Sequence, residues 1–287
     1  MPPMVHRLVT MPFRDPFAFT GITIYVLFAL VALFADQLAP LDPMEILFTK
    51  AGKLAANVGP GAEFPLGTTN LGRDIYAQLV LGTRSALAVG LSAAVIVATV
   101  GTVVGLVSGY FGGTTDAVLM RIADMALSLP FLPFVIVLTG FLGANTENIV
   151  FAVALLLWPN SARVIRSQVL SLREREFIVA VRGLGAQPAR IMLRHLLPNC
   201  LAPIIVQASL SVAAAILLEA GLSFLGVGVK PPTPTWGGML RHAFETVAQA
   251  PWLTVSPGVV IFLIVLAFNF FGDALRDVLD PRLRGTR

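Results

Sequence analysis

The residues of this chain best suited to contact another molecule lie between positions 173 and 199. Five arginines fall in this segment, together with Gly185, Pro188 and Pro198, and long apolar runs precede and follow it. Arginine offers five hydrogen-bond donors in a planar fork and keeps its charge at physiological pH. A basic loop in which glycine and proline restrict the backbone is typical of a short structured surface that binds a soluble partner. The arginines are Arg173, Arg175, Arg182, Arg190 and Arg194.

Within this segment the apolar residues predict a short amphipathic helix from about Glu176 to Gly185. Phe177, Val181 and Leu184 fall at i, i+4 and i+7, so they share one helix face. Gly185 and Pro188 should end the helix, because glycine readily takes left-handed backbone angles and proline cannot continue a helical ladder. Such a helix suits a groove on a partner protein, and a helix lying on lipid headgroups would have the same pattern.

The common catalytic motifs do not occur in the chain. A P-loop requires Gly-Lys followed by Ser or Thr, whereas the three lysines are followed by Ala, Leu and Pro. There is no Gly-x-Ser-x-Gly nucleophile elbow, and His6, His195 and His242 are too far apart for a zinc-binding HExxH helix. The single cysteine, Cys200, rules out an internal disulfide and reads as a free buried thiol. We therefore expect a non-catalytic chain without a metal or cofactor of its own.

Composition places these residues in a membrane protein. The 287 residues are 56% hydrophobic and 13% charged, with a mean hydropathy of +0.82, which is too apolar for a soluble domain. The net charge of +4 does not indicate nucleic-acid binding, because excess arginine in a membrane protein is mainly a topology signal. The expected fold class is an all-α integral membrane protein with six transmembrane helices, at about 17–34, 85–109, 117–142, 149–169, 201–224 and 256–271.

The distribution of basic residues predicts the orientation in the membrane. With both termini and the 173–199 loop in the cytoplasm, fourteen of the 20 lysines and arginines lie inside, as the positive-inside rule requires. The expected organisation is a cytoplasmic N-terminus and first transmembrane helix over 1–35, an extracytoplasmic segment over 36–82 and a core with five spans over 83–287. The extracytoplasmic segment is rich in proline and glycine and should contain one short helix near Asp74 to Leu81.

Small residues predict a close helix contact in the second span. Gly101, Gly105 and Gly109 recur at every fourth position, so they form one smooth stripe on a helix face. A neighbouring backbone can approach such a stripe closely. The contact would serve either as a moving helix crossing or as static packing.

Charged residues inside the apolar runs are candidates for function, because burying a charge in a membrane is costly. Glu219 would line a translocation path, pair with another subunit or reach the outer interface. Asp124 lies three residues after Arg121, which favours an i, i+3 ion pair, and Asp273 would stabilise an interface or a gate. Two tryptophans flank the proline-rich outer loop and are expected to anchor at lipid headgroups or to shape the outer mouth, namely Trp236 and Trp252.

An ordered set of motifs resembles the permease subunits of ATP-binding-cassette (ABC) importers, in particular the C-type permease of the dipeptide, oligopeptide and nickel family. The basic loop is similar to the EAA loop of these subunits: Val179-Ala180-Val181, Gly185 and Leu197-Pro198 take the places of its Glu-Ala-Ala, Gly and Leu-Pro. Two valines thus replace the Glu and the second Ala. The other motifs, in the family's order, are FPLGTTNLGRD at 64–74, GYFGG at 109–113, MRIAD at 120–124, RHLLPN at 194–199, LSFLG at 222–226, PPTPTWG at 231–237 and FNFFGD at 268–273.

The resemblance implies a type I ABC importer permease fold in the cell membrane, forming half of a heterodimeric pore for di- or oligopeptides or a related solute. It implies a homologous second permease, an extracytoplasmic solute-binding protein and two cytoplasmic ATPases that would bind ATP and magnesium. The alternative is an ion- or proton-coupled secondary carrier. Carriers of that class typically have broken helices in two inverted halves and buried pairs of acidic residues. Glu219 and Asp273 would lie on the translocation path or gate, and the ATPase contact would come from Glu176, Phe177, Ala180, Val181, Arg182, Leu184, Gly185, Leu197 and Pro198.

Overall fold

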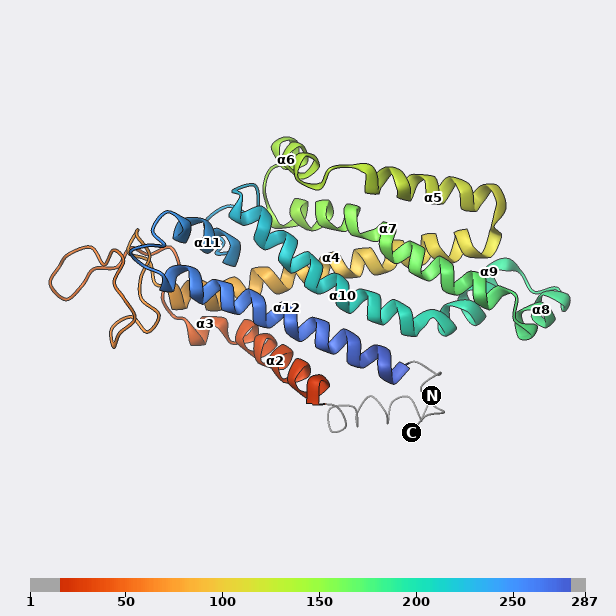
Figure 1. The fold of residues 1–287 in the computed structure, drawn as a ribbon, viewed down its shortest axis with the longest axis horizontal. Helices are drawn as coiled ribbons and strands as arrows, with labels where there is room; N and C mark the ends of the chain where they lie inside the picture. The colour runs from red at the N-terminus through yellow and green to blue at the C-terminus, as the bar shows by residue number, and fades with distance from the viewer. Residues whose placement is uncertain (1–15, 280–287) are drawn as a thin grey trace.

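The computed structural model describes residues 16–279 as a bundle of helices, with the loop over 39–74 at one end and the basic loop at the other (Figure 1). Pairing of extended segments in this part of the chain is limited to two isolated β-bridges, Phe48 with Leu54 and Thr68 with Asp74. The predicted cytoplasmic residues before position 16 and after position 279 lie outside the described residues. The helices are α2 (Pro16–Leu33), α3 (Ala35–Leu38), α4 (Ile75–Phe111), α5 (Gly113–Ser128), α6 (Phe131–Leu142), α7 (Thr146–Arg173), α8 (Glu176–Gly183), α9 (Pro188–Ile191), the π-helical η2 (Met192–Leu196), α10 (Leu197–Phe224), α11 (Trp236–Phe244) and α12 (Trp252–Leu279).

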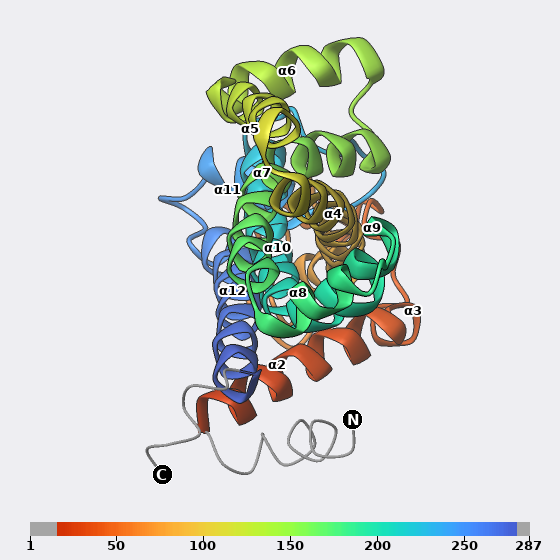
Figure 2. The ribbon, with the colours of Figure 1, turned by 90° about the vertical axis from the view of Figure 1, so that its right-hand side faces the viewer.

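Among the described residues, five helical stretches are long and apolar enough to cross a membrane. They are α2, α4, α7, the stretch from α9 to α10, and α12; α5 and α6 form a sixth if the bent pair counts as one span. α4 packs against α7 and α10, and α12 packs against α10 and α2. Figure 2 shows α5 and α6 on one side of this bundle and α2 on the other. The predicted all-α membrane fold is confirmed.

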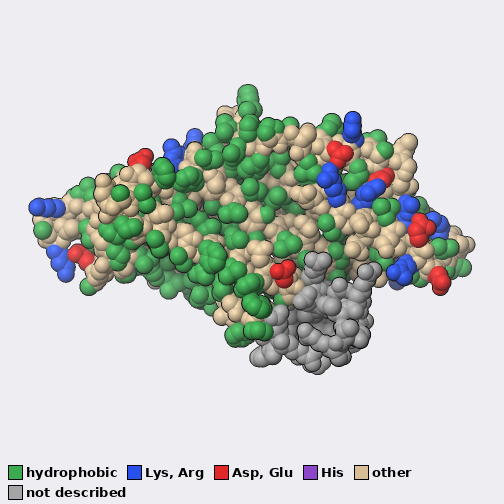
Figure 3. All heavy atoms as spheres, in the orientation of Figure 1, with side chains coloured by type: hydrophobic (Ala, Val, Ile, Leu, Met, Phe, Trp, Pro, Cys, Tyr) green, Lys and Arg blue, Asp and Glu red, His purple; other side chains and the backbone are tan. Residues whose placement is uncertain are grey.

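The sides of the bundle are apolar, and most charged side chains seen in Figure 3 lie towards its two ends. Large hydrophobic side chains stand exposed along the long helices, including Val95, Val103 and Phe262. Contiguous exposed apolar surface of this kind marks contact with lipid or with another protein. The division into apolar sides and polar ends therefore matches a protein whose long axis crosses a bilayer.

α4 begins earlier than predicted and runs without interruption over 37 residues. Asp74 starts it, because its carboxylate accepts hydrogen bonds from the backbone N–H groups of Tyr76 (3.3 Å) and Ala77 (3.2 Å). The separate short helix expected at Asp74 to Leu81 is thus wrong: those residues are the first turns of α4, and the expected boundary between residues 82 and 83 falls inside the helix. Gly82 lies within the helix, and the Trp236 indole packs directly over it, where a Cβ would overlap the ring.

The third apolar run is bent rather than straight. α5 and α6 meet at an angle of 88°, with Leu129 in an extended conformation (ψ 126°) and Pro130 at the N-cap of α6. Proline disfavours helical angles at the residue before it and lacks the N–H needed to continue the ladder. The expected single helix over Ala117 to Leu142 is therefore interrupted at Leu129 and Pro130.

The glycine stripe of α4 packs against α7. A Cβ added to Gly101 would lie 2.6 Å from the Ser161 Cβ, and a Cβ added to Gly105 would lie 2.7 Å from the Ala162 carbonyl oxygen. Gly109 is equally crowded by α7. Side chains larger than hydrogen would overlap the neighbouring helix at these positions, so the predicted close helix contact is confirmed.

Trp236 belongs to the core and not to the lipid headgroup region. Its side chain is fully buried, its Nε1 donates to the Leu79 carbonyl oxygen at 3.0 Å, and its ring packs edge-on against Phe28. Because the indole N–H finds a backbone acceptor, the whole ring can be buried. Trp252 is partly buried under the loop that contains Gly67. The expectation of headgroup anchoring is therefore wrong for Trp236.

Candidate functional sites at the two ends of the bundle

The basic loop contains the helix that its sequence predicts, ending two residues earlier, at Gly183. Gly185 follows with φ +80°. Its N–H donates to the Arg182 carbonyl at 3.0 Å, and the Ala186 N–H donates to the Val181 carbonyl at 3.3 Å. These two bonds form a Schellman motif, which satisfies the free carbonyls at a helix end and requires a left-handed residue at the position of Gly185. The backbone therefore changes direction sharply after α8.

α8 has one face against the bundle and one face towards solvent. Ile178 is fully buried, and Val181 packs with it against a cluster that includes Ile191 and Leu196. Phe177 and Leu184 face outward, with 43% and 87% of their surface exposed. The predicted stripe of Phe177, Val181 and Leu184 is therefore divided between the two faces. Glu176, Ala180 and Arg182 are also exposed.

Two arginines connect the basic loop to the end of α4. The Arg182 guanidinium lies over the Tyr110 ring, 5.5 Å from its centroid. Arg173 donates to the Gly109 carbonyl oxygen at 3.0 Å and pairs with Glu174 at 2.9 Å. Cation–π contacts and hydrogen bonds from a charged donor both favour a fixed arrangement. The loop is thus attached to a helix that is not its neighbour in sequence.

Leu197 and Pro198, the Leu-Pro pair of the loop motif, form the first turn of α10, which continues from α9 through the π-helical turn η2. Leu197 packs against the same cluster as Val181, whereas Pro198 is exposed. The structure therefore brings Val181 and Leu197, from the two halves of the motif, against one shared core.

A group of charged residues fixes α5 to α7 at this half of the bundle. Arg166 donates through Nε and a terminal nitrogen to the two carboxylate oxygens of Asp116, each at 2.5 Å, and the Ser108 hydroxyl donates to the same carboxylate. Asp124 pairs with Arg163 of α7 at 2.5 Å. The expected pair of Asp124 with Arg121 is therefore wrong, because a partner from a neighbouring helix lies within direct reach.

The two predicted path or gate residues differ in burial. Glu219 is buried within the bundle, and its carboxylate accepts a hydrogen bond from the Ser223 hydroxyl, one turn later in α10, at 2.6 Å. Asp273 is exposed on α12 and forms none of the ion pairs found among the side chains of residues 16–275. The structure does not bring the two residues together with the basic loop.

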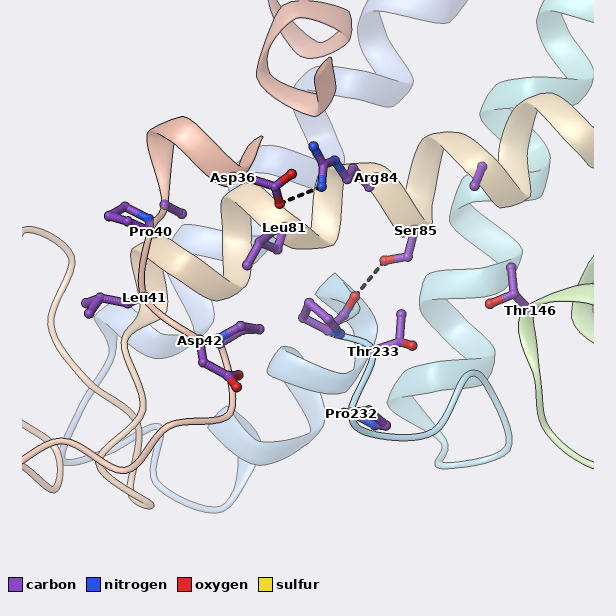
Figure 4. A pocket seen from close by; sticks show the side chains of 14 residues that line it. Asp36, Pro40, Leu41, Asp42, Leu81, Arg84, Ser85, Thr146, Pro232 and Thr233 are labelled. Atoms are coloured by element: carbon purple, nitrogen blue, oxygen red, sulfur yellow. Dashed lines mark hydrogen bonds and ion pairs between the residues drawn. The ribbon is translucent and has the colours of Figure 1, made fainter. Parts of the chain in front are cut away.

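The opposite end of the bundle has a cavity of about 700 Å³ beside the N-terminal third of α4 (Figure 4). Arg84 pairs with Asp36 at 2.7 Å across its rim, and the Ser85 hydroxyl donates to the Pro234 carbonyl oxygen at 2.5 Å. Asp42 also lines it. Because Arg84 is already neutralised by Asp36, Asp42 is the one charged residue of the lining that forms none of the ion pairs described.

A second cavity of about 430 Å³ at this end is more polar. It lies between the residues before α4, the 226–235 loop and α11. Partial burial lowers the pKa of His242 below its usual value, and the nearby charges of Arg73 and Arg241 lower it further, while Glu245 opposes them. We refer to this cavity as the basic cleft; its charged and titratable lining residues are Arg73, Lys230, Arg241, His242 and Glu245. Sequence reasoning did not single out these residues, because they come from three separate segments.

In residues 16–275, whose side chains the structure describes, no group of three or more His, Cys, Asp or Glu side chains is placed to hold a metal ion. The described cysteine, Cys200, is fully buried in the cluster beneath α8. The two ends of the bundle therefore present arginine side chains, and the basic loop also presents exposed apolar residues. Both kinds of side chain suit recognition of another molecule.

A bundle of apolar helices with a short fixed helix at its basic end has the form of a membrane permease subunit. Residues 101–285 match the family described as the inner membrane component of binding-protein-dependent transport systems, and the chain belongs to that family. It is 40% identical to the dipeptide transport system permease protein DppC of Alkalihalophilus pseudofirmus, over 99% of this chain and 94% of that one. It is 41% identical to the di/tripeptide permease DppC of Pseudomonas aeruginosa (93% and 88% covered) and 38% identical to the glutathione permease GsiD of Pectobacterium atrosepticum (92% and 86% covered).

The fold is also similar to that of a solved transporter. Two structures described as inward-facing conformations of the MetNI methionine ABC transporter match with TM-scores of 0.59 and 0.60 at 19% identity. Each match covers 71% of this chain and 96% of the other. The predicted type I ABC importer permease fold is thus confirmed, and the chain is a permease subunit of an ABC importer rather than an ion-coupled carrier.

Proposed function

We propose that this chain forms half of a heterodimeric pore that imports di- or oligopeptides or a chemically similar solute. The relatives named for dipeptides, di/tripeptides and glutathione support this solute class, because all of these ligands are short peptides or peptide-like acids. The other half of the pore would be a homologous permease. An extracytoplasmic solute-binding protein would deliver the solute, and two cytoplasmic ATPases would drive the cycle.

One observation supports the ATPase contact above the others: α8 is fixed on its inner face and apolar on its outer face. Ile178 and the Schellman turn at Gly185 hold it, while Phe177 and Leu184 project outward. Exposed apolar residues on a short helix are suited to a hydrophobic groove on a partner. Exposed Glu176, Ala180, Arg182 and Pro198 would complete the contact, and Val181 and Leu197 would support it from the inner cluster.

In this proposal the chain itself is non-catalytic, and ATP and magnesium are bound by the partner ATPases. Closure of the ATPases on ATP would move α8, and α8 would move the helices on either side of the basic loop, α7 and α10. The motion would be transmitted because the loop is short, packed and connected to α4 through Arg182 and Arg173. Each nucleotide state would favour the pore conformation in which its contacts are better.

Glu219 and Asp273 are our candidates for the path or gate. Glu219 would act after a movement of α10, since its carboxylate is buried against Ser223. Asp273 is accessible on α12 and would face the partner permease or the inner end of the path. Substitution of either residue by its amide would then change the uptake rate without releasing the ATPases.

Site-directed crosslinking tests the ATPase contact. A cysteine at Leu184, which is 87% exposed, should crosslink to a cysteine placed in the groove of a coexpressed ATPase, and the native Cys200 should not interfere because it is fully buried. A cysteine at Leu54, exposed in the opposite end loop, is the matched control and should give no crosslink. Crosslinking from Leu54 but not from Leu184, or uptake in proteoliposomes that needs a proton gradient but no ATP, would refute the proposal.

A further inference from the structure

The basic cleft holds more positive charge than the protein around it neutralises. Arg73, Lys230 and Arg241 line it together with His242, and Glu245 is its one carboxylate. Among the side chains described, those of residues 16–275, none of these five takes part in an ion pair. A cleft lined by charge of one sign concentrates ions of the opposite sign. The arrangement therefore favours an anionic ligand.

Arg73 has a hydrogen-bond donor that the protein leaves without a partner. Its Nε is buried and makes no hydrogen bond. Its backbone is fixed, because its N–H donates to the Thr69 hydroxyl oxygen at 3.1 Å and its carbonyl accepts from the Thr69 N–H at 2.9 Å. Buried polar groups in folded proteins are nearly always hydrogen-bonded, so an unpaired donor at the edge of a cavity points to a ligand that supplies the acceptor.

Arg241 is placed by the shape of the 226–235 loop. Its guanidinium lies against the backbone of Gly226, where an added Cβ would overlap it. Gly226 has φ +83°, an angle that favours glycine. The loop therefore leaves room for the guanidinium to lie beside the cleft, and a larger residue at position 226 would displace it.

We propose that the basic cleft binds a carboxylate group of the imported solute through the guanidinium groups of Arg73 and Arg241. The inference rests on the proposed import function. The planar arginine fork matches a carboxylate with two parallel hydrogen bonds, and a volume of about 430 Å³ is within the range of small-molecule sites. A free C-terminal carboxylate is shared by the peptides that the proposal assigns to this importer. The cleft would hold the solute at the outer end of the pore.

The test uses the full complex of this chain with its partner permease and ATPases in nanodiscs, without the binding protein. Binding of tri-alanine and of tri-alanine amide is measured by saturation-transfer NMR. We expect the free acid to bind about tenfold or more tightly than the amide, as loss of a charge-assisted hydrogen bond implies. Arg73→Gln and Arg241→Gln should each remove this preference, whereas Lys53→Gln, an exposed basic residue of the same end that does not line the cleft, should retain it.

Three outcomes would overturn the inference. The acid and the amide bind equally well, or Arg73→Gln and Arg241→Gln retain the preference for the acid. Alternatively, the two variants leave tri-alanine binding unchanged but, in a second experiment with the binding protein added to the same nanodiscs, weaken its association with the complex, in which case the cleft recognises an acidic protein surface instead. ATP hydrolysis by the same samples distinguishes the cleft proposal from the import proposal. An assembled, ATP-hydrolysing complex without a carboxylate preference contradicts the cleft proposal alone. Failure to assemble with ATPases contradicts the import function.

Discussion

The guanidinium of Arg182 rests on the ring of Tyr110, so the last turn of α4 supports α8, the helix of the basic loop. Ile178 contributes the apolar part of this attachment from the same helix. α8 is therefore fixed by residues that are far apart in sequence, and its outward face owes its orientation to both contacts. Loss of either contact should loosen α8 without affecting the transmembrane packing.

Replacing Tyr110 with leucine should weaken ATPase binding. The substitution removes the aromatic face beneath Arg182, and a cation–π contact at an exposed site is worth about 0.5–1 kcal/mol, which corresponds to a loss of about two- to fivefold in affinity. Tyr110→Phe keeps the ring and should bind normally. Titration of detergent-solubilised permease with fluorescent ATPase measures the effect, and equal affinity of the two variants would show that the contact does not orient α8.

Gly185→Val should uncouple the ATPases, because a β-branched residue cannot easily adopt the left-handed angles of the Schellman turn, at a cost of about 1–3 kcal/mol. Gly183→Ala is the matched control: Gly183 lies in α8, is two residues away and has open space around it. We expect the valine variant to insert in the membrane and to lose ATPase subunits on purification, while the alanine variant retains them. Full ATPase retention and substrate-stimulated hydrolysis in Gly185→Val would exclude this turn from the coupling surface.

Gly105→Leu should destabilise the permease, since the leucine would collide with the backbone of α7. Overpacking of a tight contact costs about 1–3 kcal/mol or more. Gly140→Leu is the control, because a Cβ added at position 140 meets no other atom within 4 Å. Thermal unfolding in detergent should show a lower Tm and a lower yield for Gly105→Leu alone. A normal Tm for that variant would mean that α4 and α7 separate readily.

His242 gives the end of the bundle that contains the basic cleft a defined pH response. The folded pKa is lowered, first by burial and then by Arg73 and Arg241, with Glu245 acting against them and Lys230 lining the same cleft. The unfolded chain, with a histidine pKa of about 6.5, therefore binds more protons between the two pKa values. The stability contributed by neutral His242 is complete above about pH 6.5 and is lost as pH falls through the folded pKa.

NMR titration of selectively labelled histidine should thus place the midpoint of His242 below about 6.5, and His242→Gln should reduce the loss of stability in acid. Addition of tri-alanine should raise the midpoint, because a bound carboxylate favours the imidazolium. A midpoint at or above the unfolded value in the free protein would contradict the charge arrangement of the cleft.

The parts of the fold that follow local rules could be predicted from the sequence. Residues close together along the chain determine the apolar runs, the glycine stripe and the turn at Gly185. Their period or their residue type therefore predicts these features. The bend at Leu129 and Pro130 was missed although an X-Pro pair signals it, because the surrounding apolar run extends without a polar break.

Contacts between distant residues could not be predicted in this way. Asp124 pairs with Arg163, 39 residues later, while the local i, i+3 rule favoured Arg121. Ile178 holds the inner face of α8 but lies outside the i, i+4, i+7 series of Phe177, Val181 and Leu184. The helical period alone therefore does not reveal it. The basic cleft combines three segments whose arrangement depends on how α4, α10 and α11 pack, so no single stretch of sequence contains its pattern.

The unbroken length of α4 has a mechanical consequence. At about 1.5 Å per residue its 37 residues form a rod of about 55 Å, with Tyr110 under the basic loop at one end and the turn after Arg73 at the other. A tilt of about 5° about one end would carry the other end sideways by about 5 Å, since a helix of this length moves as a rigid body. The basic loop and the basic cleft therefore lie at the two ends of one rod, so a small rotation at one end becomes a large displacement at the other.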